Sequence, residues 1–124
     1  MVELLPSIDH VAAFRLSGVL TEEDMDKIIA ELESKLKGEG KVSVYSDLTE
    51  LGDITGEALT KRVRYGFSKL AELNRFDRMA VISDKFWIRA VAGWTSRLFP
   101  QIEVKVFGSK DRQKAAEWVS RQHA

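Results

Sequence analysis

The sequence predicts an α/β domain of the order ββαβαβαβα, with a mixed, mostly parallel five-stranded sheet and helices mainly on one face. Two short apolar segments, residues 2–5 and 10–17, are joined by too few residues for a helix, which predicts an antiparallel pair. Helical and extended patterns then alternate to the end of the chain, so the later strands should run parallel. In residues 102–107, apolar side chains alternate with Glu103 and Lys105, which predicts that part of one sheet face is open to solvent.

The first helix is expected to begin after Thr21 and to end before Gly38. Thr21 is followed three residues later by Asp24, the spacing of a capping box, in which each side chain bonds to the other residue's backbone. Apolar residues then recur with helical spacing along one side: Met25, Ile28, Ile29, Leu32 and Leu36.

The remaining elements follow from the same two patterns. Strands are expected over residues 41–48, 78–83 and 102–107, and helices over residues 56–73, 84–98 and 109–122. In the helix over 56–73, the spacing predicts an inward apolar stripe and an outward basic side. The stripe comprises Leu59, Val63, Phe67 and Leu70, and the basic side comprises Lys61, Arg62, Arg64 and Lys69.

Composition bounds the class of protein. The 124 residues fit a single domain over 1–124, without an evident linker or repeat. Nineteen basic residues balance nineteen acidic ones, so no net charge steers the protein to nucleic acid or to an anionic membrane. The chain has no cysteine, which excludes disulfides and thiolate chemistry. It shows neither a signal peptide nor an apolar run long enough to insert into a membrane, so a cytoplasmic location is expected.

The sequence contains no recognisable motif for a catalytic, metal or cofactor site. His10 and His123 stand alone, outside the spacings that bind metal ions, and surface positions account for both. Phosphate-binding loops and nucleophile elbows are missing from the sequence. We therefore expect no enzyme, no metal and no cofactor.

Acidic residues gather where the third strand joins the second helix. Asp47, Glu50, Asp53 and Glu57 surround this predicted turn, which spans residues 47–56. Clustered carboxylates can bind a divalent cation, and they can equally solvate a turn and favour a helix N-terminus. Thr55 has the position of an N-cap and stands at the carboxyl end of a strand, where ligands gather in open α/β sheets.

The helix over 84–98 is apolar around most of its circumference. Trp87, Val91, Trp94 and Leu98 share one side, and Phe86 widens it. Core packing accounts for such a helix. The alternatives are a surface that is buried against a second copy, or one that encloses an apolar ligand.

Four segments carry a family resemblance: residues 14–25 (FRLSGVLTEEDM), 44–59 (VYSDLTELGDITGEAL), 80–94 (AVISDKFWIRAVAGW) and 104–119 (VKVFGSKDRQKAAEWV). Over nearly its whole length the chain resembles the SpoIIAA-like family of small bacterial proteins. That family is related in fold to STAS domains and to CRAL-TRIO lipid-binding domains. The resemblance implies a (βα) superhelix.

The resemblance also implies a candidate modification site. STAS anti-anti-sigma proteins have a D-L-S-like segment, followed by D-S-S-G, whose second serine is phosphorylated by a partner kinase. Residues 47–49 (DLT) resemble the first segment and residues 53–56 (DITG) the second, which puts Thr55 at the phosphoacceptor position. The tandem serine is absent here.

The function expected from these observations is a non-enzymatic regulatory or protein-interaction module that forms a homodimer. It would bind a protein partner through the segment 47–56, with Asp47, Asp53, Thr55 and Gly56 as contacts. The alternative, by analogy with CRAL-TRIO domains, is a carrier or sensor of a lipid or other apolar small molecule. Its pocket would be lined by Phe67, Trp87, Val91 and Trp94, the same residues that would otherwise form the dimer surface.

Overall fold

The computed structural model describes residues 1–121, apart from the side chains of residues 91, 95, 96 and 98. Five strands and four α-helices follow the predicted order: β1 (Val2–Leu4), β2 (Val11–Leu20), α1 (Glu22–Leu36), β3 (Val42–Ile54), α2 (Gly56–Ser68), β4 (Phe76–Ile82), α3 (Phe86–Leu98), β5 (Glu103–Phe107) and α4 (Arg112–Ser120). Two short 3₁₀ segments, Leu70–Arg75 and Ser109–Asp111, lie before β4 and α4.

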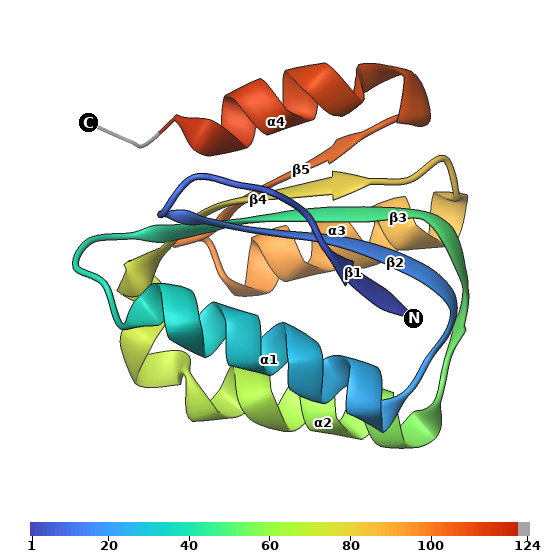
Figure 1. Ribbon diagram of the computed structural model, residues 1–124, viewed down its shortest axis with the longest axis horizontal. Coiled ribbons are helices and arrows are strands. Elements are labelled where there is room, and N and C mark those ends of the chain that lie inside the picture. Colours follow the sequence, from blue (N-terminus) through green and yellow to red (C-terminus); the bar gives the residue numbers. More distant parts are fainter. Residues whose placement is uncertain (122–124) are drawn as a thin grey trace.

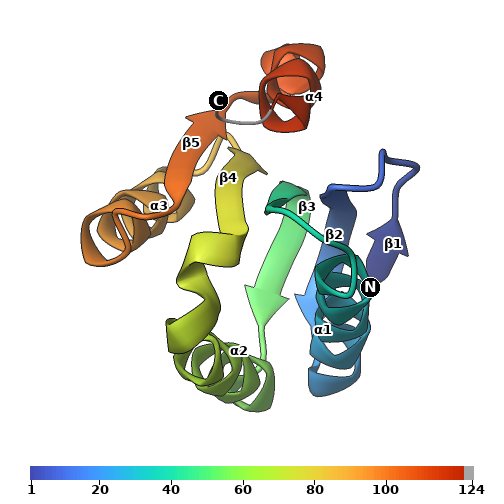
Figure 2. The same cartoon turned by 90° about the vertical axis from the view of Figure 1, so that its left-hand side faces the viewer.

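The strands lie in the sheet in the same order as in the sequence, β1-β2-β3-β4-β5. β1 pairs with β2 antiparallel, as predicted, and the other three pairs are parallel. Parallel crossovers are right-handed, so successive connections in one direction bring their helices to one face. Accordingly α1, α2 and α3 cover one face and α4 covers the other (Figures 1 and 2). The order of the described strands never reverses, so the sheet lacks the switch-point crevice in which α/β proteins often bind ligands.

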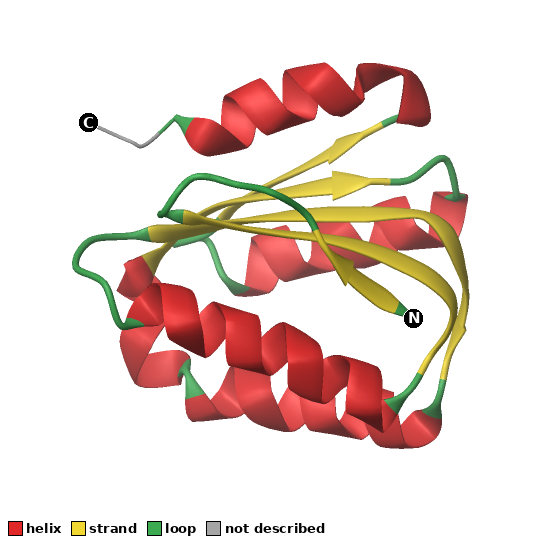
Figure 3. Cartoon of the chain, viewed as in Figure 1, coloured by secondary structure: helices red, strands yellow, loops and turns green. Residues whose placement is uncertain are grey.

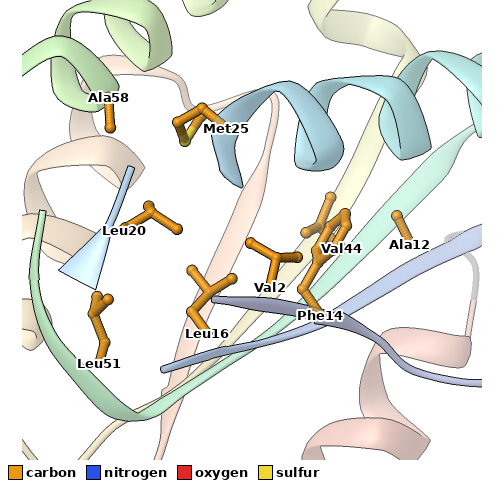
Figure 4. Packing of buried hydrophobic residues seen from close by; sticks show 9 residues of the cluster. All are labelled: Val2, Ala12, Phe14, Leu16, Leu20, Met25, Val44, Leu51 and Ala58. Atoms are coloured by element: carbon orange, nitrogen blue, oxygen red, sulfur yellow. The ribbon is translucent and has the colours of Figure 1, made fainter. Parts of the chain in front are cut away.

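Each face of the sheet has its own apolar core. Beneath α1 and the start of α2, the core contains Phe14, Leu16, Met25 and Ala58 (Figure 4). Beneath α4, Ile82 and other strand residues pack against the inward side of that helix, which presents Ala115 and Val119. The alternation of the sequence therefore divides the strand side chains between the two faces. A third cluster contains Leu36 at the end of α1 together with Val42, Phe76 and Ile102.

β3 is much longer than the predicted strand over 41–48, and it replaces most of the predicted turn over 47–56 (Figure 3). The reason is pairing, because β2 also extends past Ser17, and Leu20 pairs with Ile54. Gly18 permits this extension, since its φ of 64° belongs to the left-handed region that favours glycine. A Cβ at Gly52 would lie 3.3 Å from the Gly18 carbonyl oxygen, so the two strands approach closely where both glycines occur.

The predicted orientation of α2 is wrong. Its apolar stripe is largely exposed, with exposed fractions of 46% for Leu59, 51% for Val63 and 67% for Phe67, and Leu70 beyond the helix is also exposed. Ala58 is the one described residue of α2 that is fully buried. The predicted outward Lys61 and Lys69 instead turn toward acidic residues of α1, which fixes the apolar stripe away from that helix.

His10 has a structural role. Its ring Nε2 lies 2.8 Å from the carbonyl oxygen of Ser120, which joins the loop before β2 to the end of α4. His123 lies outside the described residues. In the part of the chain that the structure describes, no helix combines the length and the apolarity needed to cross a membrane.

Candidate functional site

Asp47 is the centre of a hydrogen-bonded network beneath the start of α4. It lies in β3, and its side chain is completely buried. Thr49 donates to Asp47 Oδ1 from its backbone nitrogen at 3.1 Å and from its hydroxyl at 2.7 Å. Arg112 at the start of α4 donates from Nε to Oδ2 at 2.9 Å and from a terminal nitrogen to the Thr49 hydroxyl at 2.9 Å. Arg15 Nε lies 3.5 Å from the same Oδ2.

These contacts keep Asp47 ionised inside the protein. Burial raises the pKa of the carboxyl, but the hydrogen bonds from Thr49 and Arg112 outweigh it, so the pKa lies below its ordinary value. A buried carboxylate with this many donors is a structural anchor, which fastens α4 to β3. The prediction that Asp47 contacts a partner does not fit this burial, because no part of its side chain reaches the surface.

Asp53, Thr55 and Gly56 remain at the surface, where β3 passes into α2. Thr55 is the N-cap of α2, and its hydroxyl accepts a hydrogen bond of 3.1 Å from the backbone nitrogen of Ala58. Asp53 is exposed and accepts from the backbone nitrogen of Ile54. Gly56 is exposed too, with open space where a Cβ would lie. The structure therefore brings these three predicted residues together and separates them from Asp47.

An open depression lies between the first turns of α1 and α2. Its volume is about 580 Å³, and it is lined by Thr21, Glu22, Glu23, Asp26, Thr55 and Glu57. Two helix N-termini meet here, and their acidic side chains offset the positive ends of the helix dipoles. No group of three or more histidine and carboxylate side chains among the described residues has the arrangement of a metal site. The chemistry of this depression suits a basic or hydrogen-bonding surface of a protein.

The residues predicted to line an apolar pocket or a dimer surface lie in α2 and α3. Phe67, Trp87 and Trp94 are exposed, by 67%, 50% and 69% respectively, and the side chain of Val91 lies outside the described residues. A shallow depression of about 360 Å³ on α2 is lined by Leu59, Thr60, Val63 and Arg64. These aromatic side chains therefore form surface, and the expectation of core packing on this side of α3 is not met for Trp87 and Trp94.

Sequence reasoning missed the role of Arg112. It lies 65 residues from Asp47 in the chain, and nothing in its local pattern distinguishes it from other surface arginines. The available signal was Asp47 itself, because an aspartate within a predicted strand needs a partner if its side chain points inward.

The SpoIIAA-like family model matches residues 11–120. The chain is similar to an uncharacterized protein of the DUF3478 family from Shewanella loihica PV-4, whose crystal structure has a SpoIIAA-like fold. The two sequences are 26% identical, and the two structures superpose with a TM-score of 0.72. The match covers 96% of this chain and 92% of that one.

The unphosphorylated form of the anti-sigma factor antagonist SpoIIAA is similar in fold, with a TM-score of 0.59 and 11% identity over 94% of this chain and 98% of that one. No curated protein sequence matches the chain. The family match extends from the start of β2 to the end of α4, and it includes every described residue of the predicted partner surface. This chain is a member of the SpoIIAA-like family.

Proposed function

We propose that the protein is a non-enzymatic regulatory module of the STAS type, which binds a protein partner where β3 passes into α2. The supporting observation is the position of Thr55, a half-buried N-cap at the rim of the acidic depression between α1 and α2. Asp53 and Gly56 flank it at the surface. A structural neighbour bears the name of an anti-sigma factor antagonist and is described as unphosphorylated, which supports regulation by a partner and by phosphate.

Phosphorylation of Thr55 would be the regulatory step of this module. A phosphate adds about two negative charges near neutral pH, and Glu22, Glu23 and Glu57 already line the depression beside Thr55. The added charge would repel these carboxylates and would make the rim more acidic. The phosphate would also occupy the space beside Thr55, so a partner that packs directly on the unmodified threonine would be released.

The test compares variants of one protein under identical conditions. Partner proteins are cross-linked to the wild type in extract of the host, identified, and then titrated as purified proteins. Thr55→Glu and Asp53→Lys should weaken binding at least tenfold. Thr60→Glu is the matched control, because Thr60 is an exposed threonine farther along the same helix.

Equal affinities for Thr55→Glu and Thr60→Glu would refute the proposed surface. Intact-mass analysis of the protein from its host should show a phosphorylated fraction that the Thr55→Val variant lacks. A phosphorylated fraction that persists in this variant would place the modification elsewhere.

A second candidate function is a carrier of an apolar small molecule, supported by the exposed Phe67, Trp87 and Trp94. Native mass spectrometry of the protein from its host should then show an added mass of lipid size. Replacing both tryptophans with alanine should remove that mass. The same spectrum reports whether the protein forms the homodimer that the sequence predicts.

A further inference from the structure

β5 is an edge strand, and no further strand in the part of the chain that the structure describes pairs with its outer side. The sheet ends with β1 on one side and β5 on the other (Figure 2). An unpaired edge presents a row of backbone donors and acceptors, which attracts another strand unless the sequence blocks it. The two edges of this sheet differ in how far they are blocked.

The β1 edge is short, whereas the β5 edge is open to pairing. β1 has only three residues, and Pro6 follows it closely, which limits this edge as a template for another strand. β5 has five residues without proline or glycine, and it pairs with β4 without a register shift. α4 packs mainly against β3 and β4, away from the β5 edge (Figure 2). A strand could therefore add to the sheet beside β5.

The backbone of β5 shows which residues would bond to a new strand. The backbone nitrogen of Ser83 donates to the Phe107 carbonyl oxygen at 3.0 Å, so Phe107 directs its backbone groups toward β4. Successive residues of a strand direct these groups to alternate sides, so every second residue back to Glu103 does the same. Val104 and Val106 stand between them, and each directs one N–H and one C=O to the outer side.

Charged side chains on the α4 face form rows that alternate in sign from strand to strand. Glu3, Arg15 and Asp47 are neighbours across β1, β2 and β3, and Arg15 forms ion pairs with the other two. Arg78 of β4 is the neighbour of Glu103 in β5, and its Nε lies 3.3 Å from that carboxylate. The second row reaches the edge of the sheet at Glu103, where a cation would come next.

Lys105 is the cation that a second copy of the chain would supply at this place. It lies on the same face of β5 as Glu103, two residues farther along the strand. Lys105 forms no ion pair with a described residue, and its Nζ lies 5.3 Å from the ring centre of Phe107 and 5.8 Å from that of Trp118. A strand that carries both a glutamate and a lysine on one face is complementary to an antiparallel copy of itself.

We infer that two copies of the protein pair along β5, antiparallel, about a two-fold axis at Val104. Val104 of each copy exchanges both backbone hydrogen bonds with Val104 of the other, and Glu103 of each copy lies opposite Lys105 of the other. The two sheets become one continuous sheet. α3 packs against β5 on the other face, so the two copies of α3 also meet and enlarge the interface beyond the strands.

The charges select this axis among the possible ones. In an antiparallel pair about a two-fold axis, one residue faces its own copy. An axis at Lys105 would set lysine against lysine, and an axis at Glu103 would set glutamate against glutamate, and both arrangements are destabilising. An axis at Val106 would leave Glu103 without a basic residue opposite. The axis at Val104 is the one that pairs both charges twice.

The test measures the dimer dissociation constant by sedimentation velocity over a series of protein concentrations. Glu103→Lys and Lys105→Glu should each raise the constant roughly tenfold, because two symmetry-related pairs become pairs of like charge. Tenfold corresponds to about 1.4 kcal/mol. An equimolar mixture of the two variants should form heterodimers, and both changes in one chain should restore the dimer. Failure of the mixture to associate better than either variant alone would overturn the inference.

The matched control lies in the other edge strand. Glu3 is an exposed glutamate of β1 that pairs with Arg15, as Glu103 pairs with Arg78. Glu3→Lys should leave the dissociation constant within about twofold of the wild type. An equal loss in Glu3→Lys and Glu103→Lys would show a general effect of charge and would overturn the assignment to β5.

Val104→Pro tests the backbone bonds independently of charge. Proline lacks the N–H that Val104 would donate to the second copy, and an edge strand tolerates proline where the N–H points away from the sheet. The variant should be a monomer, and far-UV circular dichroism should show that it is folded. A folded variant that remains a dimer would overturn the inference, as would a wild type that is monomeric at every concentration.

Two further variants separate this interface from other surfaces. The pairing does not rest on the partner surface beside Thr55, so Thr55→Glu should leave the dimer intact. A dimer that Phe67→Asp converts to a monomer, and that Glu103→Lys leaves unchanged, would place the interface on the outer side of α2 and would refute the pairing along β5.

Discussion

α1 and α2 lie side by side on the same face of the sheet, yet they are held in place by different forces (Figure 1). Both follow a strand of the parallel β2–β3 pair, and both begin with a threonine N-cap, Thr21 or Thr55. α1 buries Met25 and Leu36, whereas α2 fully buries only Ala58. α1 is thus anchored by apolar packing, and α2 is anchored largely by its polar side.

The polar side of α2 contacts α1 through two lysines. Lys61 lies 3.2 Å from Glu22 and 2.5 Å from Asp26, and Lys69 lies 2.8 Å from Glu33. Tyr65 lies between them, and burial, together with the nearby charge of Glu33, raises its pKa to about 12. Helical spacing therefore identifies the apolar side of a helix without showing which way that side points. An acidic neighbour can turn the basic side inward.

The largest difference in the free energy of unfolding should appear when an apolar side chain of α1 and one of α2 are each truncated. Met25→Ala in α1 should lower the free energy of unfolding by about 2–5 kcal/mol, because Met25 is only 4% exposed and its loss leaves a cavity. Phe67→Ala in α2 should change it by less than about 0.5 kcal/mol, because Phe67 is exposed. Urea unfolding of both variants measures the contrast, and equal losses would show that the α2 stripe is packed after all.

The two N-caps should differ by a smaller amount in their contributions to the free energy of unfolding. Thr21 and Asp24 form a complete capping box, in which Asp24 accepts from the Thr21 backbone nitrogen at 3.0 Å and Thr21 accepts from the Asp24 backbone nitrogen at 3.3 Å. Thr55 makes a single cap bond, since Ala58 has no side-chain acceptor. Thr21→Ala should therefore cost about 1–2 kcal/mol and Thr55→Ala about 1 kcal/mol, measured by thermal unfolding. A larger cost at Thr55 would contradict the comparison.

The capping box also predicts that the stability of the protein depends on pH in the acid range. Burial raises the pKa of Asp24, but hydrogen bonds from Thr21 and the nearby N-terminal ammonium outweigh it, so the folded-state pKa is lowered. The contribution to stability is then present above the unfolded-state pKa and is lost as the pH falls through the folded-state pKa. Unfolding of the wild type and Asp24→Asn at a series of pH values should converge in acid. A constant difference between them at every pH would exclude this linkage.

The smallest change in the free energy of unfolding should come from removing the ion pair of Lys69 with Glu33 of α1. Lys69→Met should lower the free energy of unfolding by no more than about 1 kcal/mol, because ion pairs near the surface contribute little. The loss should shrink further in high salt, which screens the pair with Glu33. The same cost in low and high salt would show that Lys69 stabilises α2 through its aliphatic stem.

Much of the fold could be predicted from the sequence because its signals are local. The capping box at Thr21 and Asp24 is confirmed, as are the antiparallel first pair and the order of elements. The length of β3 could not be predicted in this way, because residues 49–54 include Gly52 and Asp53, which are residue types typical of a turn. Their extended conformation depends on pairing with β2, which is a long-range contact.

The candidate site was predicted in part. Thr55 was expected as the N-cap of α2, and the structure agrees. The position of Asp47 within a strand could suggest a buried partner, but no local pattern could identify that partner as Arg112, which comes from the far end of the chain. The exposure of Trp87 and Trp94 depends on which neighbours α3 acquires, and spacing along one helix does not contain that information.

The sequential order of the strands has a consequence for how the protein is made. Each strand after β1 pairs with the one synthesised before it, so the sheet can grow by one strand at a time as the chain leaves the ribosome. The helix α4 emerges after all the described strands, and until then the sheet face containing Tyr45 and Ile82 has no cover. A nascent chain that stalls before Arg112 would thus expose this apolar sheet face, together with the Asp47 carboxylate that has not yet met Arg112. Such an exposed surface is a target for chaperones.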